Sequence, residues 1–162
     1  SKQATQIFNS FPGSSGGTLY FKDGVLWAGL RQVLYSLDTG KTWNVSLASL
    51  STPNEVVMNF DFLNSTVGLM RTASNLYLTQ DGGMSWNVQT APGNAGSRYS
   101  ILAGSAAIVI SLAQNGIYVS NDGGTSWTKK YTGANPNIAA YKDGGTIAVY
   151  EAGASRLVID HE

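Results

Sequence analysis

The sequence predicts an all-β protein made of repeated, four-stranded antiparallel units, and three observations support this prediction. A turn-like segment that ends in tryptophan recurs as SLDTGKTW, TQDGGMSW and SNDGGTSW, and its aspartates Asp38, Asp81 and Asp122 lie 43 and 41 positions apart. Each copy follows a short aliphatic and aromatic run that is typical of a β-strand. Apolar residues nowhere keep a helical spacing over three turns, so we expect no helix.

The strands of one unit can be assigned in order. Two β-rich runs joined by turn residues come first, in residues 18–30, 56–70, 99–112 and 137–151. The third strand is the run just before the recurring turn, in residues 33–36, 76–79, 117–120 and 156–159, and a fourth strand follows the tryptophan in the first three units. Pairs such as Asp-Gly between alternating runs favour tight hairpins, which supports antiparallel pairing.

Four antiparallel strands in roughly 40 residues are typical of one blade of a β-propeller. The fourth unit ends before its outer strand, whereas residues 4–11 precede the first complete unit. The sequence therefore predicts one propeller domain over residues 1–162, with residues 1–12 as the outer strand that closes the last blade. The four blades are expected at 13–50, 51–93, 94–134 and 135–162. A dimeric ring of eight blades and a fragment of a longer propeller are the alternatives.

The recurring turn has a mechanical explanation at each position. An aspartate in a tight turn accepts hydrogen bonds from nearby backbone N–H groups, and the glycine two positions later can take a positive φ. The hydroxyl residue can satisfy further turn groups, and the tryptophan supplies apolar area between blades. We expect a structural role for these residues: Asp38, Gly40, Thr42, Trp43, Asp81, Gly83, Ser85, Trp86, Asp122, Gly124, Ser126 and Trp127.

These three segments resemble the Asp-box of the bacterial neuraminidase repeat. The repeat length and the segment FDFLNSTVGL at 60–69 are most similar to propellers of photosystem II assembly factors, sortilin-type receptors and xyloglucanases. The resemblance implies a β-propeller with each box between the third and fourth strands of a blade. It implies no single function, because sialidases, glucanases, receptors and assembly factors share the motif.

Composition excludes several classes of function. The chain carries 10 basic and 10 acidic residues, and only 12% of its residues are charged, against about 25% in an average domain. No basic stripe is available for nucleic acid. No apolar run is long enough for membrane insertion. The absence of cysteine excludes disulfides and thiolate metal sites. We expect no metal or other cofactor, and the neutral, hydroxyl-rich surface favours an extracellular, periplasmic, lumenal or virion-associated protein.

Catalytic interpretations are weaker than a binding interpretation. Sialidases combine an arginine triad with a tyrosine–glutamate pair, and no motif here places the four arginines in that pattern. A glycosidase needs two carboxylates beside a cleft. Asp61 and Glu151 are the candidates, although nothing in the sequence pairs them. The only histidine, His161, lies next to the C-terminal residue. The prediction is therefore no catalytic residue, with a relative of an Asp-box glycoside hydrolase as the alternative.

The favoured hypothesis is a non-catalytic recognition module for a protein or glycan, on a cell surface or in a phage-like or secreted assembly. A purely structural or oligomerisation propeller is a further alternative. Arginines near the turns between second and third strands are expected to gather on one rim, where they either serve solubility or contact an anion or glycan. The candidate ligand contacts are Arg31, Arg71, Arg156, Asp61, Glu151 and Tyr150.

Overall fold

The structure is a computed structural model. It describes residues 17–89, 99–103, 108–112, 116–132, 136–142, 146–151 and 156–160, with side chains described within 17–89 and 116–132. These residues form fifteen strands arranged in antiparallel sheets, so the predicted all-β architecture is confirmed. The described part of the chain holds no helix of the length and hydropathy needed to cross a bilayer.

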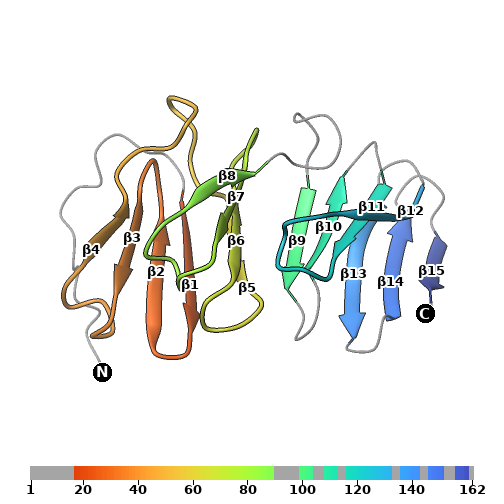
Figure 1. Cartoon of the computed structure of the whole chain (residues 1–162), viewed down its shortest axis with the longest axis horizontal. Helices are drawn as coiled ribbons and strands as arrows, with labels where there is room; N and C mark the ends of the chain where they lie inside the picture. The colour runs from red at the N-terminus through yellow and green to blue at the C-terminus, as the bar shows by residue number, and fades with distance from the viewer. Residues whose placement is uncertain are drawn as a thin grey trace, which may run out of the picture.

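Each sheet takes its strands in chain order, as Figure 1 shows. The first sheet contains β1 (Thr18–Lys22), β2 (Val25–Gly29), β3 (Val33–Ser36) and β4 (Asn44–Leu47). The second contains β5 (Asn59–Phe62), β6 (Gly68–Arg71), β7 (Leu76–Thr79) and β8 (Asn87–Gln89). The third contains β9 (Tyr99–Ala103), β10 (Ile108–Leu112), β11 (Gly116–Ser120) and β12 (Thr128–Tyr131). The fourth has three described strands, β13 (Pro136–Lys142), β14 (Thr146–Glu151) and β15 (Arg156–Asp160).

Local sequence accounts for the hairpin that opens the first sheet. Asp23 and Gly24 connect β1 to β2, and both have positive φ, 51° and 83°. Two such residues match the right-handed twist of the flanking strands, which is why Asp-Gly is favoured here. The hairpin pairs Tyr20 with Trp27 and places both on the face that meets the second sheet.

The main core lies between the first and second sheets and draws on every strand of the first. Its buried members come from β2, β3, β5, β6 and β7 and from the segments just before β5 and β8: Trp27, Val33, Val57, Phe60, Phe62, Met70, Tyr77 and Trp86. Half-buried residues from β1 and β4, among them Tyr20 and Leu47, complete it. The Trp27 and Phe62 rings lie 4.5 Å apart between centroids. The two sheets are therefore packed face to face over most of their width.

A second core joins the second sheet to the third. Leu69, Leu76 and Leu78 are buried on the opposite face of the second sheet, and Tyr118 and Trp127 of the third unit pack against this leucine cluster. The second sheet thus buries both of its faces, one against each neighbour. Such two-sided burial is what stacked blades require, since a lone sheet would expose its apolar faces.

Ser46 on β4 ties the first sheet to the second by polar contacts. Its hydroxyl donates to the carbonyl oxygen of Gly83 and accepts a hydrogen bond of 3.0 Å from the indole nitrogen of Trp86. Both partners belong to the turn that joins β7 to β8. One side chain therefore aligns the outer strand of one sheet with the turn of the next.

The four sheets stand in an open row, and the described strands do not form the closed four-bladed ring that the repeat count predicts. The inner strands contact one another in succession, β1 with β5, β5 with β9 and β9 with β13. The first and fourth sheets lie at opposite ends of the molecule in Figure 1. A closed ring of four would bring the first sheet against the fourth, whereas the main contacts between described strands of different sheets join only neighbouring sheets. Residues 1–12, predicted to close the ring, lie outside the described residues, and the predicted blade boundaries stay predictions.

We expect Ser46→Ala to lower the free energy of unfolding by about 1–3 kcal/mol, because it leaves the Trp86 indole nitrogen and the Gly83 carbonyl without this partner. Denaturant unfolding followed by tryptophan fluorescence measures the change. Ser49→Ala is a matched control, since Ser49 is exposed just beyond the end of β4. Equal stability of the two variants would show that the Ser46 contact contributes nothing.

Candidate functional site

The recurring turns, called Asp turns below, span residues 36–43, 79–86 and 120–127 and join the third strand of a sheet to the fourth. In the first, the Asp38 carboxylate accepts hydrogen bonds from the Thr42 backbone N–H at 2.9 Å and the Thr42 hydroxyl at 2.7 Å. The Ser36 hydroxyl donates to Asp38 at 2.8 Å and accepts from the Gly40 N–H at 2.8 Å. The turn thus contains a closed circuit of bonds among residues at most four apart.

The other two Asp turns repeat this circuit. In the second turn, Asp81 accepts hydrogen bonds from the Ser85 backbone N–H at 2.9 Å and from the Ser85 hydroxyl at 2.6 Å. In the third turn, Asp122 accepts hydrogen bonds from the Ser126 backbone N–H at 2.9 Å and from the Ser126 hydroxyl at 2.5 Å. Gly83 and Gly124 donate their N–H groups to the hydroxyl residue that ends the preceding strand. Each of these aspartates therefore stabilises the turn in which it lies.

Hydrogen bonding keeps the turn carboxylates ionised. Bonds from Thr42, its backbone N–H foremost, lower the pKa of Asp38 to about 2, and bonds from Ser126, its hydroxyl foremost, lower the pKa of Asp122 to about 2. Burial raises the pKa of Asp81, but bonds from Ser85 and Thr79 outweigh it and lower the pKa overall. None of the three is a proton donor near neutral pH.

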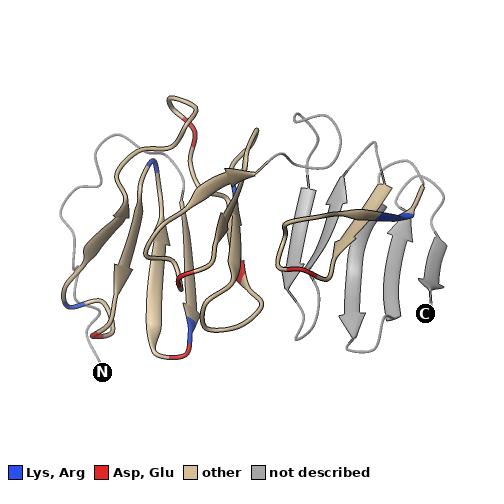
Figure 2. Ribbon diagram, in the orientation of Figure 1, with Lys and Arg blue, Asp and Glu red and all other residues tan. Residues whose placement is uncertain are grey.

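The Asp turns lie along one end of the first three sheets, and Figure 2 shows their acidic residues there in red. They belong to different sheets and are exposed or half-buried. Their arrangement provides neither a pair of carboxylates beside a cleft nor a metal site. No group of three or more His, Cys, Asp or Glu residues able to hold a metal ion occurs in the described part of the chain.

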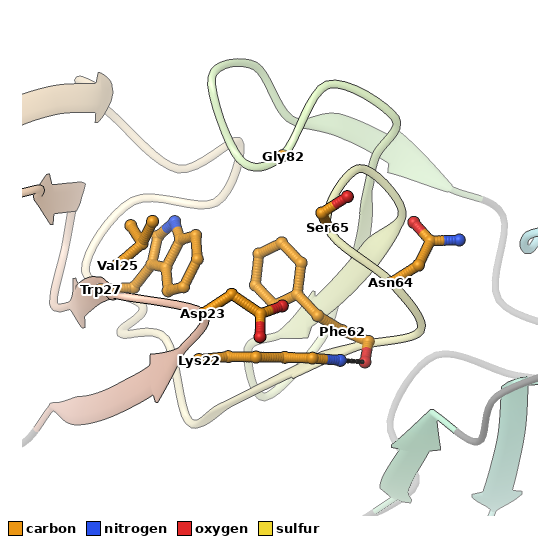
Figure 3. Close-up of a pocket in the computed structure, with 8 residues that line it drawn as sticks. All are labelled: Lys22, Asp23, Val25, Trp27, Phe62, Asn64, Ser65 and Gly82. Atoms are coloured by element: carbon orange, nitrogen blue, oxygen red, sulfur yellow. Dashed lines mark hydrogen bonds between the residues drawn. The ribbon is translucent and has the colours of Figure 1, made fainter.

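A small cavity opens at this same end, at the boundary between the first and second sheets, and we call it the boundary pocket. Its volume is about 110 Å³. Figure 3 shows the residues that line it, from the β1–β2 hairpin, from β2, from the end of β5 and the loop after it, and from the second Asp turn: Lys22, Asp23, Val25, Trp27, Phe62, Asn64, Ser65 and Gly82. Two sheets therefore contribute to one hollow.

The walls of the boundary pocket combine apolar and polar groups. Trp27 and Phe62 form the inner wall and are only 4% and 2% exposed, so little of either ring is open to a ligand. The Lys22 ammonium donates to the Phe62 carbonyl oxygen at 2.6 Å, which holds its charge at the mouth. Asp23, Asn64 and Ser65 are exposed around the opening. The pocket thus has an apolar interior and a polar rim.

The Trp27 indole nitrogen is buried and has no hydrogen-bond partner. In Figure 3 it lies on the edge of the ring that faces the Gly82 turn. A Cβ on Gly83 would come within 2.6 Å of this nitrogen, so glycine is what allows the turn to pass so close to the indole. An unsatisfied buried donor of this kind is uncommon in folded proteins.

Beside the pocket, Tyr20 on β1 and Asp61 on β5 join the inner strands of the first two sheets. The Tyr20 hydroxyl donates to the Asp61 carboxylate at 3.2 Å, and the Phe62 N–H donates to the same oxygen at 2.9 Å. Burial and the neighbouring Asp61 charge raise the pKa of Tyr20 to about 12. The phenol is therefore un-ionised at neutral pH, and this tyrosine–carboxylate pair is a structural link rather than a nucleophile.

Two of the predicted ligand contacts, Arg31 and Arg71, lie at the opposite end of the sheets from the boundary pocket. Arg31 is exposed in the β2–β3 turn and donates to the Asn54 side chain at 3.2 Å. Arg71 ends β6 and contacts the Met58 sulfur at 3.4 Å. Asp61, the third described candidate, lies on an inner strand, so the structure does not gather these three residues into one site.

The remaining candidates are placed only by their strands. Tyr150 and Glu151 end β14, and Arg156 begins β15 directly opposite Glu151 in the register. Their side chains lie outside the described residues. The proposed clustering of the arginines on one rim therefore stays a prediction for Arg156.

Sequence reasoning missed the residues of the boundary pocket. In the sequence, Asp23 is marked only by an Asp-Gly hairpin signal, and Asn64 and Ser65 only as residues between two strands. The sequence does show that the two segments occupy equivalent positions, because each follows the inner strand of its repeat. Recognising a shared pocket would have required knowing that these two hairpins lie side by side.

Comparisons with known proteins identify the fold but no family. No family model matches the chain, and no curated protein matches it. Among solved structures, it is similar to YCF48 from Cyanidioschyzon merolae, with 17% identity and a TM-score of 0.63 over 98% of this chain and 59% of that one. A structure described as YCF48 bound to D1 peptide matches with 17% identity and a TM-score of 0.58 over 90% and 54% of the two chains.

A GH74 enzyme from Niastella koreensis also matches, with 11% identity and a TM-score of 0.43 over 86% of this chain and 28% of that one, too low a score to support an argument. The chain spans little more than half the length of the two YCF48 structures. Those two similarities establish a fold of propeller type.

Acid should selectively weaken the Asp turns. Because the pKa of Asp122 in the folded protein is about 2, below its ordinary value of 3.8, its hydrogen bonds stabilise the fold above about pH 4, and this stabilisation is lost as the pH falls toward 2. We expect Asp122→Asn to be less stable than the parent chain at pH 7 and the difference to shrink below pH 4. Urea unfolding at a series of pH values measures it. A constant difference down to pH 2 would contradict the role of the charge.

Thr39 is a second test of the Asp turn. Its φ is 61°, whereas the second and third turns have glycine, Gly82 and Gly123, at the equivalent position. A β-branched residue is strained in this left-handed region. We therefore expect Thr39→Gly to raise the free energy of unfolding by about 0.5–1 kcal/mol. Thr125→Gly is the control, because Thr125 lies in a turn without this strain, and its substitution should not raise the free energy of unfolding. Thermal unfolding gives the comparison, and a loss of stability in Thr39→Gly would contradict the strain.

Proposed function

We propose that the chain is a non-catalytic recognition module of propeller type, that its ligand is a polypeptide, and that the boundary pocket receives one small, neutral side chain of that ligand. The observation that carries the proposal is the pocket itself, an apolar hollow with a polar rim built from two successive sheets. Its volume of about 110 Å³ lies well below the 300–1,000 Å³ of ordinary small-molecule sites. A hollow of this size suits a single side chain better than a whole metabolite.

The chemistry of the pocket walls limits which kind of ligand side chain can fit. The interior is formed by Trp27, Phe62 and Val25, which favour an apolar group. At the mouth, Lys22 and Asp23 carry opposite charges, so neither sign of ligand charge is selected. A short side chain with an apolar stem, followed by polar backbone at the rim, fits these groups.

The structural comparisons support a binding role at the level of the fold. One similar structure is described as bound to a peptide, and its likeness to this chain covers 90% of the chain at 17% identity. That complex is a property of the other protein, and the choice of a polypeptide ligand here rests on the pocket. Membership of the Asp-box family, suggested by the three turns, is part of the same proposal, as is a location outside the cytoplasm.

A glycan ligand is the second candidate, since Arg31, Arg71 and Arg156 occupy turns or strand ends at the β2–β3, β6–β7 and β14–β15 connections. A glycan is not expected in the boundary pocket, because stacking of a sugar requires an open aromatic ring face and Trp27 is buried. Hydrolysis of a glycan by Asp61 is not supported either, because its carboxylate is held by Tyr20 and the Phe62 N–H.

Selection from a peptide library displayed on phage tests the proposal, with a glycan array run in parallel. We expect peptides that share one small, neutral residue. Ser65→Leu should fill the pocket from the rim and weaken binding of a selected peptide by about tenfold or more, equivalent to about 1.4 kcal/mol. Isothermal titration calorimetry gives the affinities.

Ala73→Leu is the matched control, because it adds the same side chain to the same sheet at an exposed position, in the β6–β7 turn at the other end. It should bind the peptide as the parent chain does. Equal peptide affinity of the two variants would show that the boundary pocket is not the binding site. Glycan binding without peptide binding, or turnover of a chromogenic glycoside that is lost in Asp61→Asn, would replace the proposal with one of its alternatives.

A further inference from the structure

The mouth of the boundary pocket is held in shape on both sides. On the first sheet, Asp23 and Gly24 form a two-residue turn with positive φ at both positions, which fixes where the Asp23 side chain leaves the backbone. On the second sheet, the Asn64 side-chain oxygen accepts hydrogen bonds from the Thr66 N–H at 2.9 Å, the Thr66 hydroxyl at 2.9 Å and the Val67 N–H at 2.8 Å. The loop after β5 is therefore closed by its own hydrogen bonds.

This loop is also tied to the second Asp turn. The Gly82 N–H donates to the Thr66 carbonyl oxygen at 2.8 Å. A Cβ on Gly82 would come within 2.8 Å of the Ser65 carbonyl oxygen, so glycine is what allows the turn to contact the loop directly. Both sides of the mouth are thus ordered before a ligand arrives, which reduces the entropy lost on binding.

Hydrogen-bonding groups of both kinds remain available at the mouth. The Lys22 ammonium uses one of its three N–H donors on the Phe62 carbonyl oxygen, at 2.6 Å. Among the described residues, none donates a hydrogen bond to the Asp23 carboxylate or forms an ion pair with it. Figure 3 shows that the Lys22 and Asp23 side chains both extend from the β1–β2 hairpin toward Phe62. Two adjacent residues therefore offer a ligand donors and an acceptor.

A donor beside an acceptor matches the needs of a polypeptide backbone. Each residue inside a chain presents one N–H and one carbonyl oxygen, and both require partners when water is excluded. The Asp23 carboxylate accepts from an N–H group, and the Lys22 ammonium donates to a carbonyl oxygen. One neutral residue of a ligand backbone would thus use both side chains at once.

The same two charges disfavour a chain end at this place. An α-ammonium group would be attracted by Asp23 and repelled by Lys22, and an α-carboxylate would experience the reverse. The pocket interior, formed by Val25, Trp27 and Phe62, offers little to replace the hydration of a charge. Because a charge that leaves water without a net partner is costly, an uncharged peptide group is the better fit.

We infer that the boundary pocket binds an internal residue of its polypeptide ligand, with Asp23 accepting the backbone N–H and Lys22 donating to the backbone carbonyl oxygen of that residue. This inference rests on the proposed function and adds the class of partner, an exposed loop or an extended segment rather than a chain end. Asp23 and Lys22 then determine specificity for backbone, while the hollow selects the side chain.

Truncated versions of one selected peptide test the inference by isothermal titration calorimetry. The first pair ends at the small, neutral residue on its N-terminal side and carries either a free α-ammonium or an acetyl cap. The second pair ends there on its C-terminal side, with a free carboxylate or an amide cap. We expect each free end to bind about tenfold more weakly than its capped partner of the same length, because the cap restores a neutral peptide group.

Two substitutions at one position separate an acceptor from a charge. Asp23→Gly removes the carboxylate, and Asp23→Asn keeps an acceptor oxygen, and both glycine and asparagine tolerate the positive φ of this turn. We expect Asp23→Gly to bind the doubly capped peptide about tenfold more weakly and Asp23→Asn to bind it nearly as the parent chain does. Thermal unfolding of both variants verifies that the hairpin is intact.

Several results would overturn the inference while leaving the pocket as a peptide site. They are tighter binding of either free end than of its capped partner, an equal loss of affinity in Asp23→Gly and Asp23→Asn, and unchanged affinity in Asp23→Gly. Equal peptide affinity of Ser65→Leu and Ala73→Leu would instead overturn the proposed function together with this inference. Weaker binding of both free ends, with rescue by Asp23→Asn, establishes recognition of an internal residue.

Discussion

Burial of each sheet on both faces is the constraint on which the rest of this structure depends. The strands are short, and a sheet of four such strands exposes apolar side chains on each side unless another sheet covers it. The second sheet satisfies this requirement with an aromatic core on one face and a leucine core on the other. The second and third Asp turns and the Ser46 contacts contribute to this burial, because they hold Trp86 and Trp127 against the preceding sheet.

The boundary pocket follows from the same packing. Wherever two sheets meet, the hairpins at their ends must come together around side chains that differ from unit to unit. At the first boundary the β1–β2 hairpin brings a lysine and an aspartate, and the loop after β5 brings polar Asn64 and Ser65. The repeated part of each unit builds the scaffold, and the variable part builds the surface that can discriminate ligands.

Local features could be predicted from the sequence, and features that depend on two units could not. The spacing of Asp38, Gly40 and Thr42 indicates a turn whose partners lie within a few residues, and the strands before and after it follow from their apolar patterns. By contrast, Tyr20 and Asp61 meet across 41 positions, and only sheet packing brings them together. The repeat count predicts how many sheets form but contains no information on the angle between them, which explains why a closed ring of four was expected.

The short range of the Asp turn contacts has a consequence for how the chain folds. A bond between residues four apart closes with little loss of chain entropy, whereas contacts such as Tyr20 with Asp61 must close a loop of about forty residues. Each turn and its flanking hairpin can therefore form early and independently, as in other repeat proteins. We expect docking of one finished sheet on the next to be the slow step, so the contacts of the Asp turns exist before it and substitutions in these turns should slow folding more than they speed unfolding.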